Sequence, residues 1–236
     1  VIRVDSVEDM FNLAKAFDRA KLLAGNRVGI LTNAGGPAIL TVDEADKCGL
    51  DVVNLSENTK SKLREIVLPE ASVNNPVDLL PPANAQVYGK AAEIMLADEN
   101  VDAGILILGP PLMYDTVEIT KNLCEAANKS GKCAIVVVMS QDEIIADVAK
   151  VAPERPPVFN SAEKAAWAIG EMLKYKKHKE TQDGVVKKFN VNSKGVKSII
   201  KKYKTGNVYL DFNDVYDILN HYEMPIVETK ISRNVQ

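Results

Sequence analysis

Residues 27–37 read RVGILTNAGGP, and this stretch decides the fold. Val28–Thr32 is a short apolar run typical of a strand, and Asn33–Gly36 follow it as a glycine-containing turn. We expect a helix to begin at Pro37, because the first helical position needs no backbone N–H, and to end near Gly49, which suits the residue after a last turn. The stretch predicts a strand, a tight turn and a helix, the repeating unit of an α/β fold.

The same alternation continues along the chain. Further strands are expected at Val52–Leu55, Ala103–Leu108, Cys133–Met139 and Pro157–Phe159, and helices at residues 59–66, 84–97, 115–130, from 142 onward and 161–174. The two longest strands are apolar on both faces, as in a parallel sheet that helices cover on both sides. The pattern predicts a flavodoxin-like, doubly wound α/β domain with a parallel five-stranded sheet of order 2-1-3-4-5, with the strands of Val28, Ile105 and Val136 at its centre.

The two ends of the chain differ in composition from this domain. The expected division is residues 1–22 for a connecting strand and helix, 23–175 for the flavodoxin-fold domain, 176–206 for a Lys-rich linker and 207–236 for the start of another domain. Ser6 is expected to cap the first helix. Residues 182–206, partly helical around 196–203, are too polar to bury much apolar area and are expected to be mobile. Because the chain opens on Val1 rather than Met, we expect it to be a piece of a longer protein.

Composition and charge restrict the function classes. The 236 residues include 29 Lys+Arg, 32 Asp+Glu and 3 Cys, and no apolar run reaches the roughly 20 residues of a membrane span. Net charge is +6 from Lys174 onward and −9 before it, which argues against nucleic-acid binding by the acidic body. Without a secretory signal, we expect a cytoplasmic protein that binds no membrane. Cys48, Cys124 and Cys133 show no CxxC spacing and are expected to be reduced core residues.

The turn Asn33-Ala34-Gly35-Gly36 is the candidate phosphate-binding site. In a doubly wound sheet, ligands bind at the carboxyl ends of the strands beside the switch point, where this turn is expected to lie. Backbone N–H groups at a helix N-terminus favour an anion, and glycines let a phosphate approach closely. No Walker lysine or GxGxxG pattern accompanies the turn. The alternative is that the glycines only permit a tight turn.

Two further loops are expected to support this site. The loop from Gly109 and Pro110 to Tyr114 follows the third strand and could form a wall of the same crevice, or be a plain connection. Asn75 and Asp78 are expected to anchor the neighbouring loops through hydrogen bonds to the backbone.

Residues suited to catalysis or metal binding are scarce in the chain. The two histidines, His178 and His221, lie in charged or polar surroundings without a glycine loop or acid partner nearby. No metal-ligand cluster and no nucleophile elbow is found. We therefore expect no catalytic residue and no metal site within this sequence.

Several separated motifs carry a family resemblance. Residues 25–37 (GNRVGILTNAGGP), 43–50 (DEADKCGL) and 68–78 (LPEASVNNPVD) occur in this order. Because of these motifs, the chain from Val1 to about Lys174 resembles the NDP-forming (ADP-forming) acyl-CoA synthetases, which are relatives of succinyl-CoA synthetase. The matching part is the central, flavodoxin-like ligase-CoA domain. Residues 210–231 resemble the first helix and strand of the family's ATP-grasp half.

The resemblance implies a function. Family members interconvert acyl-CoA, phosphate and ADP with a carboxylic acid, CoA and ATP, through an acyl phosphate and a phosphohistidine, with Mg²⁺ at the ATP-grasp site. Asn33, Ala34, Gly35 and Gly36 match the motif whose helix N-terminus points at the phosphohistidine. The implied partners are the CoA-binding and ATP-grasp domains of the same protein and a small carboxylic acid, and the resemblance leaves room for a homo-oligomer. The histidine loop is absent here, so this chain alone is expected to be inactive.

Two other interpretations stay open at this point. Some protein acetyltransferases carry a synthetase-like regulatory region of the same ancestry that performs no phosphoryl transfer. A free-standing flavodoxin-like module could bind a nucleotide or flavin, although the turn lacks hydroxyl residues and only 6% of the residues are aromatic. The sequence names neither the acid nor the nucleotide preference.

Overall fold

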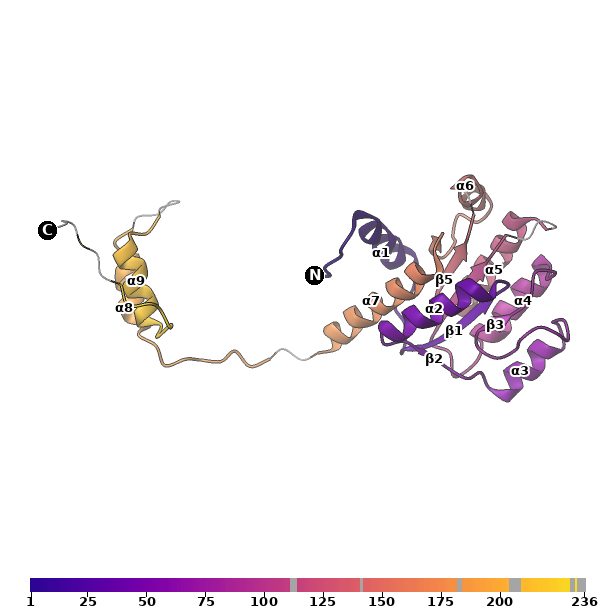
Figure 1. Cartoon of the computed structure of the whole chain (residues 1–236), viewed down its shortest axis with the longest axis horizontal. Coiled ribbons are helices and arrows are strands. Elements are labelled where there is room, and N and C mark those ends of the chain that lie inside the picture. The colour runs from indigo at the N-terminus through magenta and orange to yellow at the C-terminus, as the bar shows by residue number, and fades with distance from the viewer. Residues whose placement is uncertain (111–113, 141, 182–183, 204–208, 230–231, 233–236) are drawn as a thin grey trace. The chain divides into compact units, whose positions relative to one another are not determined.

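The computed structural model describes residues 1–110, 114–140, 142–181, 184–203, 209–229 and 232 (Figure 1). The chain divides into two compact units, Val1–Gln182 and Asp183–Gln236. The sheet and the helices α1 to α7 belong to the first unit, and α8 and α9 belong to the second.

The first unit is built around a parallel sheet. Its strands are β1 (Arg27–Thr32), β2 (Asp51–Val52), β3 (Val77–Asp78), β4 (Ala103–Leu108), β5 (Cys133–Val138) and β6 (Val158–Phe159). They lie in the order β2-β1-β4-β5-β6, β3 also pairs with β1, and all these pairings are parallel. The predicted order and the central position of the Val28, Ile105 and Val136 strands are therefore confirmed.

β3 is a strand that the sequence pattern did not predict. β1 pairs with β2 at Arg27 and Val28 and with β3 at Leu31 and Thr32, so the two short strands share one edge of β1. Each is two residues long, which is too short for an alternating pattern to be recognised. The expected strand Val52–Leu55 is also shorter than predicted, because β1 changes its neighbour from β2 to β3 along this edge.

Helices cover both faces of the sheet. They are α1 (Val7–Arg19), α2 (Gly35–Lys47), α3 (Glu57–Arg64), α4 (Ala85–Leu96), α5 (Thr116–Ser130), α6 (Asp142–Val151) and α7 (Ala162–Glu180). One apolar cluster joins the sheet to α1, α2 and α7, and a second joins it to α3, α4, α5 and α6 (Figure 1). Successive residues of β4 alternate between them, with Ile105 and Ile107 in one cluster and Leu106 and Leu108 in the other. This two-sided burial explains why the central strands are apolar throughout.

The helix α2 begins earlier than the sequence predicts. Its first residue is Gly35, with Ala34 as the N-cap, so Pro37 occupies the third helical position instead of the first. The placement is compatible with proline because the N–H at the third position also lacks a partner inside the helix. The predicted end is correct, since Gly49 follows the last turn with φ +74°.

The helix α7 is longer than the expected 161–174. Its apolar face ends at Leu173, but the helix continues to Glu180 through a Lys-rich segment. Ion pairs of helical spacing join Lys174 to Glu171 at 2.6 Å and Lys176 to Glu180 at 3.6 Å. Straight-chain residues with such pairs favour a solvated helix without an apolar stripe.

The second unit contains two helices, α8 (Ser193–Ile200) and α9 (Phe212–His221). Val196 and Ile199 of α8 are buried, and the Tyr203 hydroxyl donates to Asp214 of α9 at 2.6 Å. The helical part of the expected linker thus packs with the segment assigned to the next domain. In the described part of the chain, no helix has the length and apolar character needed to span a lipid bilayer.

Candidate functional site

The N-terminus of α2 presents two free backbone donors at the carboxyl end of β1. Within the described residues, the N–H groups of Gly35 and Gly36 donate to no protein group. Pro37 has no N–H, and the N–H of Ala38 donates to the Ala34 carbonyl at 3.3 Å. Both free donors lie at the positive end of the helix dipole, which suits an anionic ligand with two oxygens in reach.

The two glycines leave this helix end open. A Cβ added at Gly36 would have no heavy atom within 4 Å, and one at Gly35 would lie 3.8 Å from Asp78 Oδ2. Neither glycine adopts a positive φ. Internal packing and backbone conformation therefore do not require glycine at these two positions. A tight turn alone does not account for them.

Side chains of β1 and its turn hold the helix start in place. The Thr32 hydroxyl is buried; it accepts from the Ala34 N–H at 2.9 Å and lies 3.1 Å from the Ala34 carbonyl, to which it can donate. Ala34 itself has no side chain that could cap α2. The hydroxyl therefore uses the Ala34 N–H internally, and the donors left for a ligand are those of the two glycines.

Asn33 connects this turn to the end of β4. Its carboxamide donates to the Gly109 carbonyl at 2.7 Å and accepts from the Gly109 N–H at 2.8 Å. The side chain is only 7% exposed. The structure thus brings the predicted Asn33 and Gly109 together, but Asn33 is committed to the protein backbone. Pro110 follows on the surface, and residues 111–113 of this loop lie outside the described residues.

Asn75 and Asp78 occupy two different places. The Asn75 carboxamide accepts from the Ile30 N–H at 2.9 Å and donates to the Val28 and Val53 carbonyls, both at 2.8 Å, so it replaces a strand residue between β2 and β3. Asp78 accepts from the Leu80 N–H through Oδ1 at 3.0 Å, while Oδ2 lies beside Gly35. Only Asp78 is close to the helix start.

A carboxylate beside two N–H donors restricts the ligands that fit. The Tyr88 hydroxyl of α4 is buried without a partner among the described residues, and burial first, then the Asp78 charge, raise the pKa of this phenol. A bare dianion would be repelled by Asp78, whereas a ligand that also carries an N–H or O–H can satisfy it. Sequence reasoning missed Tyr88 because its spacing is that of a core residue.

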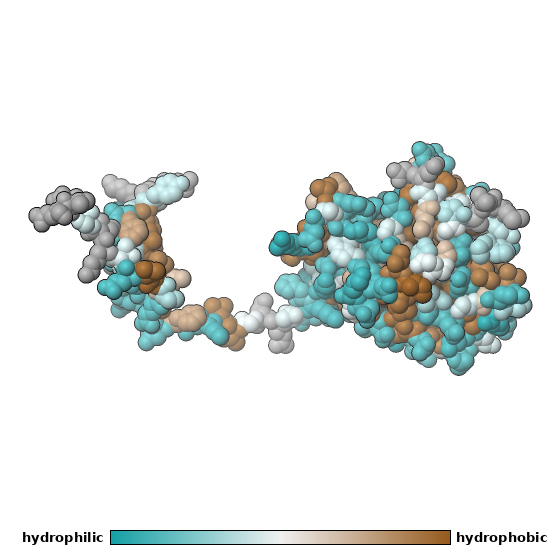
Figure 2. All heavy atoms as spheres, viewed as in Figure 1, coloured by the Kyte–Doolittle hydropathy of each residue, from teal (hydrophilic) through white to brown (hydrophobic). Residues whose placement is uncertain are grey.

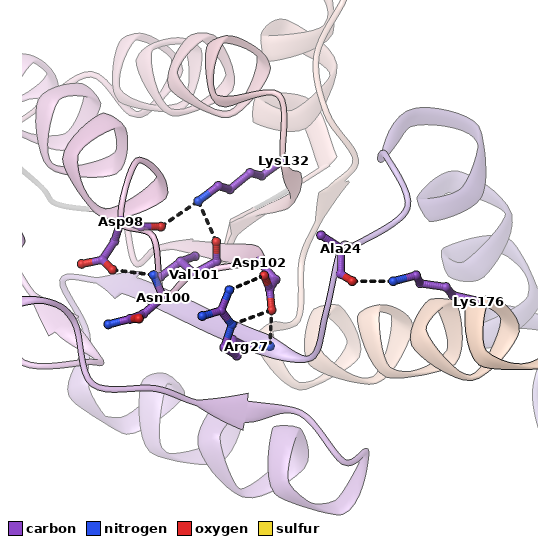
Figure 3. A network of polar contacts seen from close by, with 8 residues as sticks. All are labelled: Ala24, Arg27, Asp98, Asn100, Val101, Asp102, Lys132 and Lys176. Atoms are coloured by element: carbon purple, nitrogen blue, oxygen red, sulfur yellow. Dashed lines mark hydrogen bonds and ion pairs between the residues drawn. The ribbon is translucent and has the colours of Figure 1, made fainter. Parts of the chain in front are cut away.

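The opposite end of the same strands carries a network of polar contacts (Figure 3). Arg27 donates to both oxygens of Asp102 at 2.9 and 2.8 Å, which lowers the pKa of that carboxyl. Lys132 donates to the Asp98 and Val101 carbonyls at 2.8 and 2.6 Å. At the same edge, Lys176 of α7 donates to the Ala24 carbonyl. These contacts bond the charged side chains to protein groups and so stabilise this end of the sheet.

A groove of about 760 Å³ lies between α3, α4 and α5 near this amino end of the sheet. Four lysines line it: Lys62, Lys90, Lys129 and Lys132. Two of them pair with Glu93, at 3.4 Å from Lys90 and 2.8 Å from Lys129. The groove is remote in the fold from the α2 N-terminus, so the two features do not form one site.

The cysteines and His221 form no metal-binding cluster among the described residues. Cys48, Cys124 and Cys133 are buried free thiols, and burial is the main cause that raises their pKa values to about 11, 12 and 12. His221 hydrogen-bonds with Asn192 inside the second unit. Among the described residues, no group of three or more His, Cys, Asp and Glu could hold a metal ion.

Hydrophobic residues are also exposed on α2, next to the open helix end. Ile39 and Leu40 are 60% and 52% exposed. Figure 2 shows a mostly hydrophilic surface on the first unit, interrupted by apolar patches. Exposed apolar residues of this kind are suited to contact with another protein surface.

Two ADP-forming CoA ligases resemble this chain, one over about half of its length and the other over almost all of it. A region of the acetate–CoA ligase [ADP-forming] II subunit alpha of Pyrococcus furiosus is 44% identical over 111 residues, which is 47% of this chain and 24% of that protein. The 4-hydroxybutyrate–CoA ligase [ADP-forming] of Nitrosopumilus maritimus is 25% identical over 99% of this chain and 33% of its own length. The chain thus spans a third or less of these relatives.

A solved structure has the same fold. The crystal structure of PH0766 from Pyrococcus horikoshii OT3 superposes with a TM-score of 0.70 at 31% identity, covering 77% of this chain and 42% of that one. Residues 28–175, which contain the sheet and the α2 N-terminus, match the Ligase-CoA domain. This match covers more than half of the chain. The chain therefore belongs to the NDP-forming acyl-CoA synthetase family, of which it carries the Ligase-CoA domain.

Proposed function

We propose that this chain works as the Ligase-CoA domain of an ADP-forming acyl-CoA synthetase, which interconverts acyl-CoA, phosphate and ADP with a carboxylic acid, CoA and ATP. The observation that carries the proposal is the match over residues 28–175, because both relatives described above are ADP-forming CoA ligases. No observation favours the regulatory alternative of an acetyltransferase. The acid substrate belongs to the class of small carboxylic acids.

The α2 N-terminus has a specific role in this proposal: it receives the phosphoryl group. The two N–H groups of Gly35 and Gly36 hold oxygens of a phosphohistidine that another domain of the synthetase brings to the site. Asp78 supports this assignment, since its free oxygen beside Gly35 can accept a hydrogen bond from an imidazole N–H. A phosphorylated histidine carries both anionic oxygens and such an N–H, and a protonated phosphate can satisfy Asp78 through its O–H.

The other parts of the reaction are assigned to other domains. CoA belongs to the CoA-binding domain, and ATP or ADP with Mg²⁺ to the ATP-grasp domain. The exposed residues Ile39 and Leu40 provide apolar area for contact with the domain that delivers the phosphoryl group.

The proposal is tested with the complete synthetase. A panel of small carboxylates is screened for CoA- and ATP-dependent formation of acyl-CoA and ADP, and acid-labile phosphohistidine is measured after incubation with ATP. We expect activity with at least one carboxylate. We also expect a phosphohistidine that loses its phosphoryl group when CoA and that carboxylate are added. A complete synthetase that forms AMP, or that acylates protein lysines without releasing ADP, would contradict the proposal.

A further inference from the structure

The Asn33 carboxamide makes a closed pair of hydrogen bonds with one peptide group of a distant segment. It contacts both the N–H and the carbonyl of Gly109, which is 76 positions away along the chain. The pair joins the turn before α2 to the loop after β4, at the two strand ends that flank the switch point. One buried side chain therefore connects both walls of the candidate site.

Gly109 is adapted to this contact. A Cβ at this position would lie 3.3 Å from Ala34 Cβ and 3.4 Å from Asn33 Oδ1, both closer than usual. The missing side chain thus lets the N-cap residue of α2 pack directly against the end of β4. Because Ala34 cannot cap the helix itself, the position of the helix start depends on Thr32 and Asn33.

We propose that Asn33 is a positioning residue for phosphoryl transfer and not a phosphate ligand. Its contact with Gly109 holds the N–H groups of Gly35 and Gly36 at a fixed place relative to the loop after β4. The inference rests on the function proposed above and changes the role of Asn33, which the family resemblance places in the phosphate-binding motif. One N–H of its Nδ2 and its Oδ1 already bond the Gly109 backbone, and the residue is only 7% exposed, so little of the side chain is accessible to a ligand.

The first test measures steady-state kinetics of the complete synthetase in the direction that consumes phosphate. Asn33→Ala is expected to raise KM for phosphate about tenfold and to leave KM for acyl-CoA unchanged. Asn75→Ala is the matched control, because it removes a carboxamide that also hydrogen-bonds the β1 backbone but does not touch Gly109. It is expected to lower Tm without changing KM for phosphate.

A double-mutant cycle separates a positioning residue from a ligand. Gly109→Ala pushes against Ala34 and Asn33, so it is expected to raise KM for phosphate as well, and the double variant should be no worse than the poorer single variant. Additive effects of Asn33→Ala and Gly109→Ala would show that Asn33 acts on the ligand directly and would overturn the inference.

Asn33→Asp makes the contact with Gly109 dependent on pH, and KM for phosphate is the quantity measured. The introduced carboxylate repels the Gly109 carbonyl, whereas its protonated form can again donate to that carbonyl and accept from the N–H. KM for phosphate, relative to wild type at each pH, is expected to recover as pH falls. Asp78 is the charged group beside Gly35, and it is common to both proteins.

The outcomes separate a failure of the proposed function from a failure of the positioning role of Asn33. If Gly35→Val Gly36→Val turns over normally, the proposed function of the helix N-terminus fails. If that double variant is inactive but Asn33→Ala has wild-type KM for phosphate, only the positioning role fails. An equal rise in KM for phosphate in Asn33→Ala and Asn75→Ala would likewise reduce Asn33 to general stability.

Discussion

The two ends of the central strands are stabilised by different chemistry. At the amino end, charged groups are paired with each other or with carbonyls, as for Arg27 with Asp102 and Lys132 with Val101. At the carboxyl end, a neutral carboxamide, Asn33, holds the loops together and two N–H groups stay free. We call the amino end, with its paired charges, the closed end, and the carboxyl end, with its two unpartnered N–H groups, the open end. Asp78 is the charged group that lies beside the open end.

The largest expected effect tests the open end. Gly35→Val Gly36→Val fills the space in front of the two donors, and both positions accept a side chain without a positive φ or an internal clash. In the complete synthetase we expect phosphoryl transfer to fall about 10³-fold, the range seen when an oxyanion donor is lost, with KM for CoA unchanged. Rapid-quench measurement of phosphohistidine checks this. Normal transfer in the folded double variant would reduce the turn to a structural element.

The closed end should respond in stability and not in catalysis. Asp98 is 2% exposed and accepts hydrogen bonds from the Ser56 N–H, the Ser56 hydroxyl and the Asn100 N–H. Asp98→Ala leaves these half-buried donors without their protein partner and is expected to lower the free energy of unfolding by about 2–3 kcal/mol. Urea unfolding of the chain measures the loss. An unchanged KM for phosphate in the complete synthetase would sharpen the contrast, and a raised one would break it.

The pH dependence of stability should also originate at the closed end. Burial raises the pKa of Asp98, but hydrogen bonds from Thr59, Asn100 and Ser56 outweigh it and leave that pKa below its ordinary value. The Arg27 guanidinium is the main cause that lowers the pKa of Asp102. Both carboxyls thus stabilise the fold fully above their unfolded pKa of about 4, and this contribution is lost as pH falls through the lower folded values.

Thermal unfolding between pH 7 and pH 3 checks this expectation. Wild type should lose Tm in acid, and Asp102→Asn, which starts from a lower Tm at pH 7, should lose less. An identical acid-induced loss in both proteins would place the titrating groups elsewhere, for example at Asp9, whose carboxyl bonds Lys164 at 2.5 Å and also has a lowered pKa.

The smallest expected effect concerns the second unit, because both ends of the sheet lie in the first. Lys187 and Lys188 are exposed in a segment without regular structure, so limited trypsin digestion should cut there before it cuts the body. The remaining fragment is expected to keep the Tm of the intact chain within about 2 °C. First cleavage inside α4 or α5, with Lys187–Lys204 intact, would show that the Lys-rich segment is protected.

The sequence predicts the sheet because the central strands are buried on both faces and therefore consist of apolar residues. β4 and β5 are apolar at all positions, and connections between parallel strands have few allowed topologies. The sequence predicts a start of α2 at Pro37 instead of Gly35, because a glycine pair has low helix propensity and proline prefers the first helical position. The contact between Asn33 and Gly109 leaves no local signal, since it joins positions that only the folded sheet brings together. The same holds for Asn75 as a substitute strand residue.

The proline at the third position of α2 limits the number of hydrogen bonds that this helix end can donate to an anion. A terminal phosphoryl group has three oxygens, and this helix end offers N–H donors from Gly35 and Gly36 alone, because Pro37 has none. At least one oxygen therefore remains for donors of the delivering or accepting domain. On the proposed function, this helix end holds the phosphoryl group incompletely by itself, and the hydrogen bonds of the group are completed by the domain that delivers or accepts it.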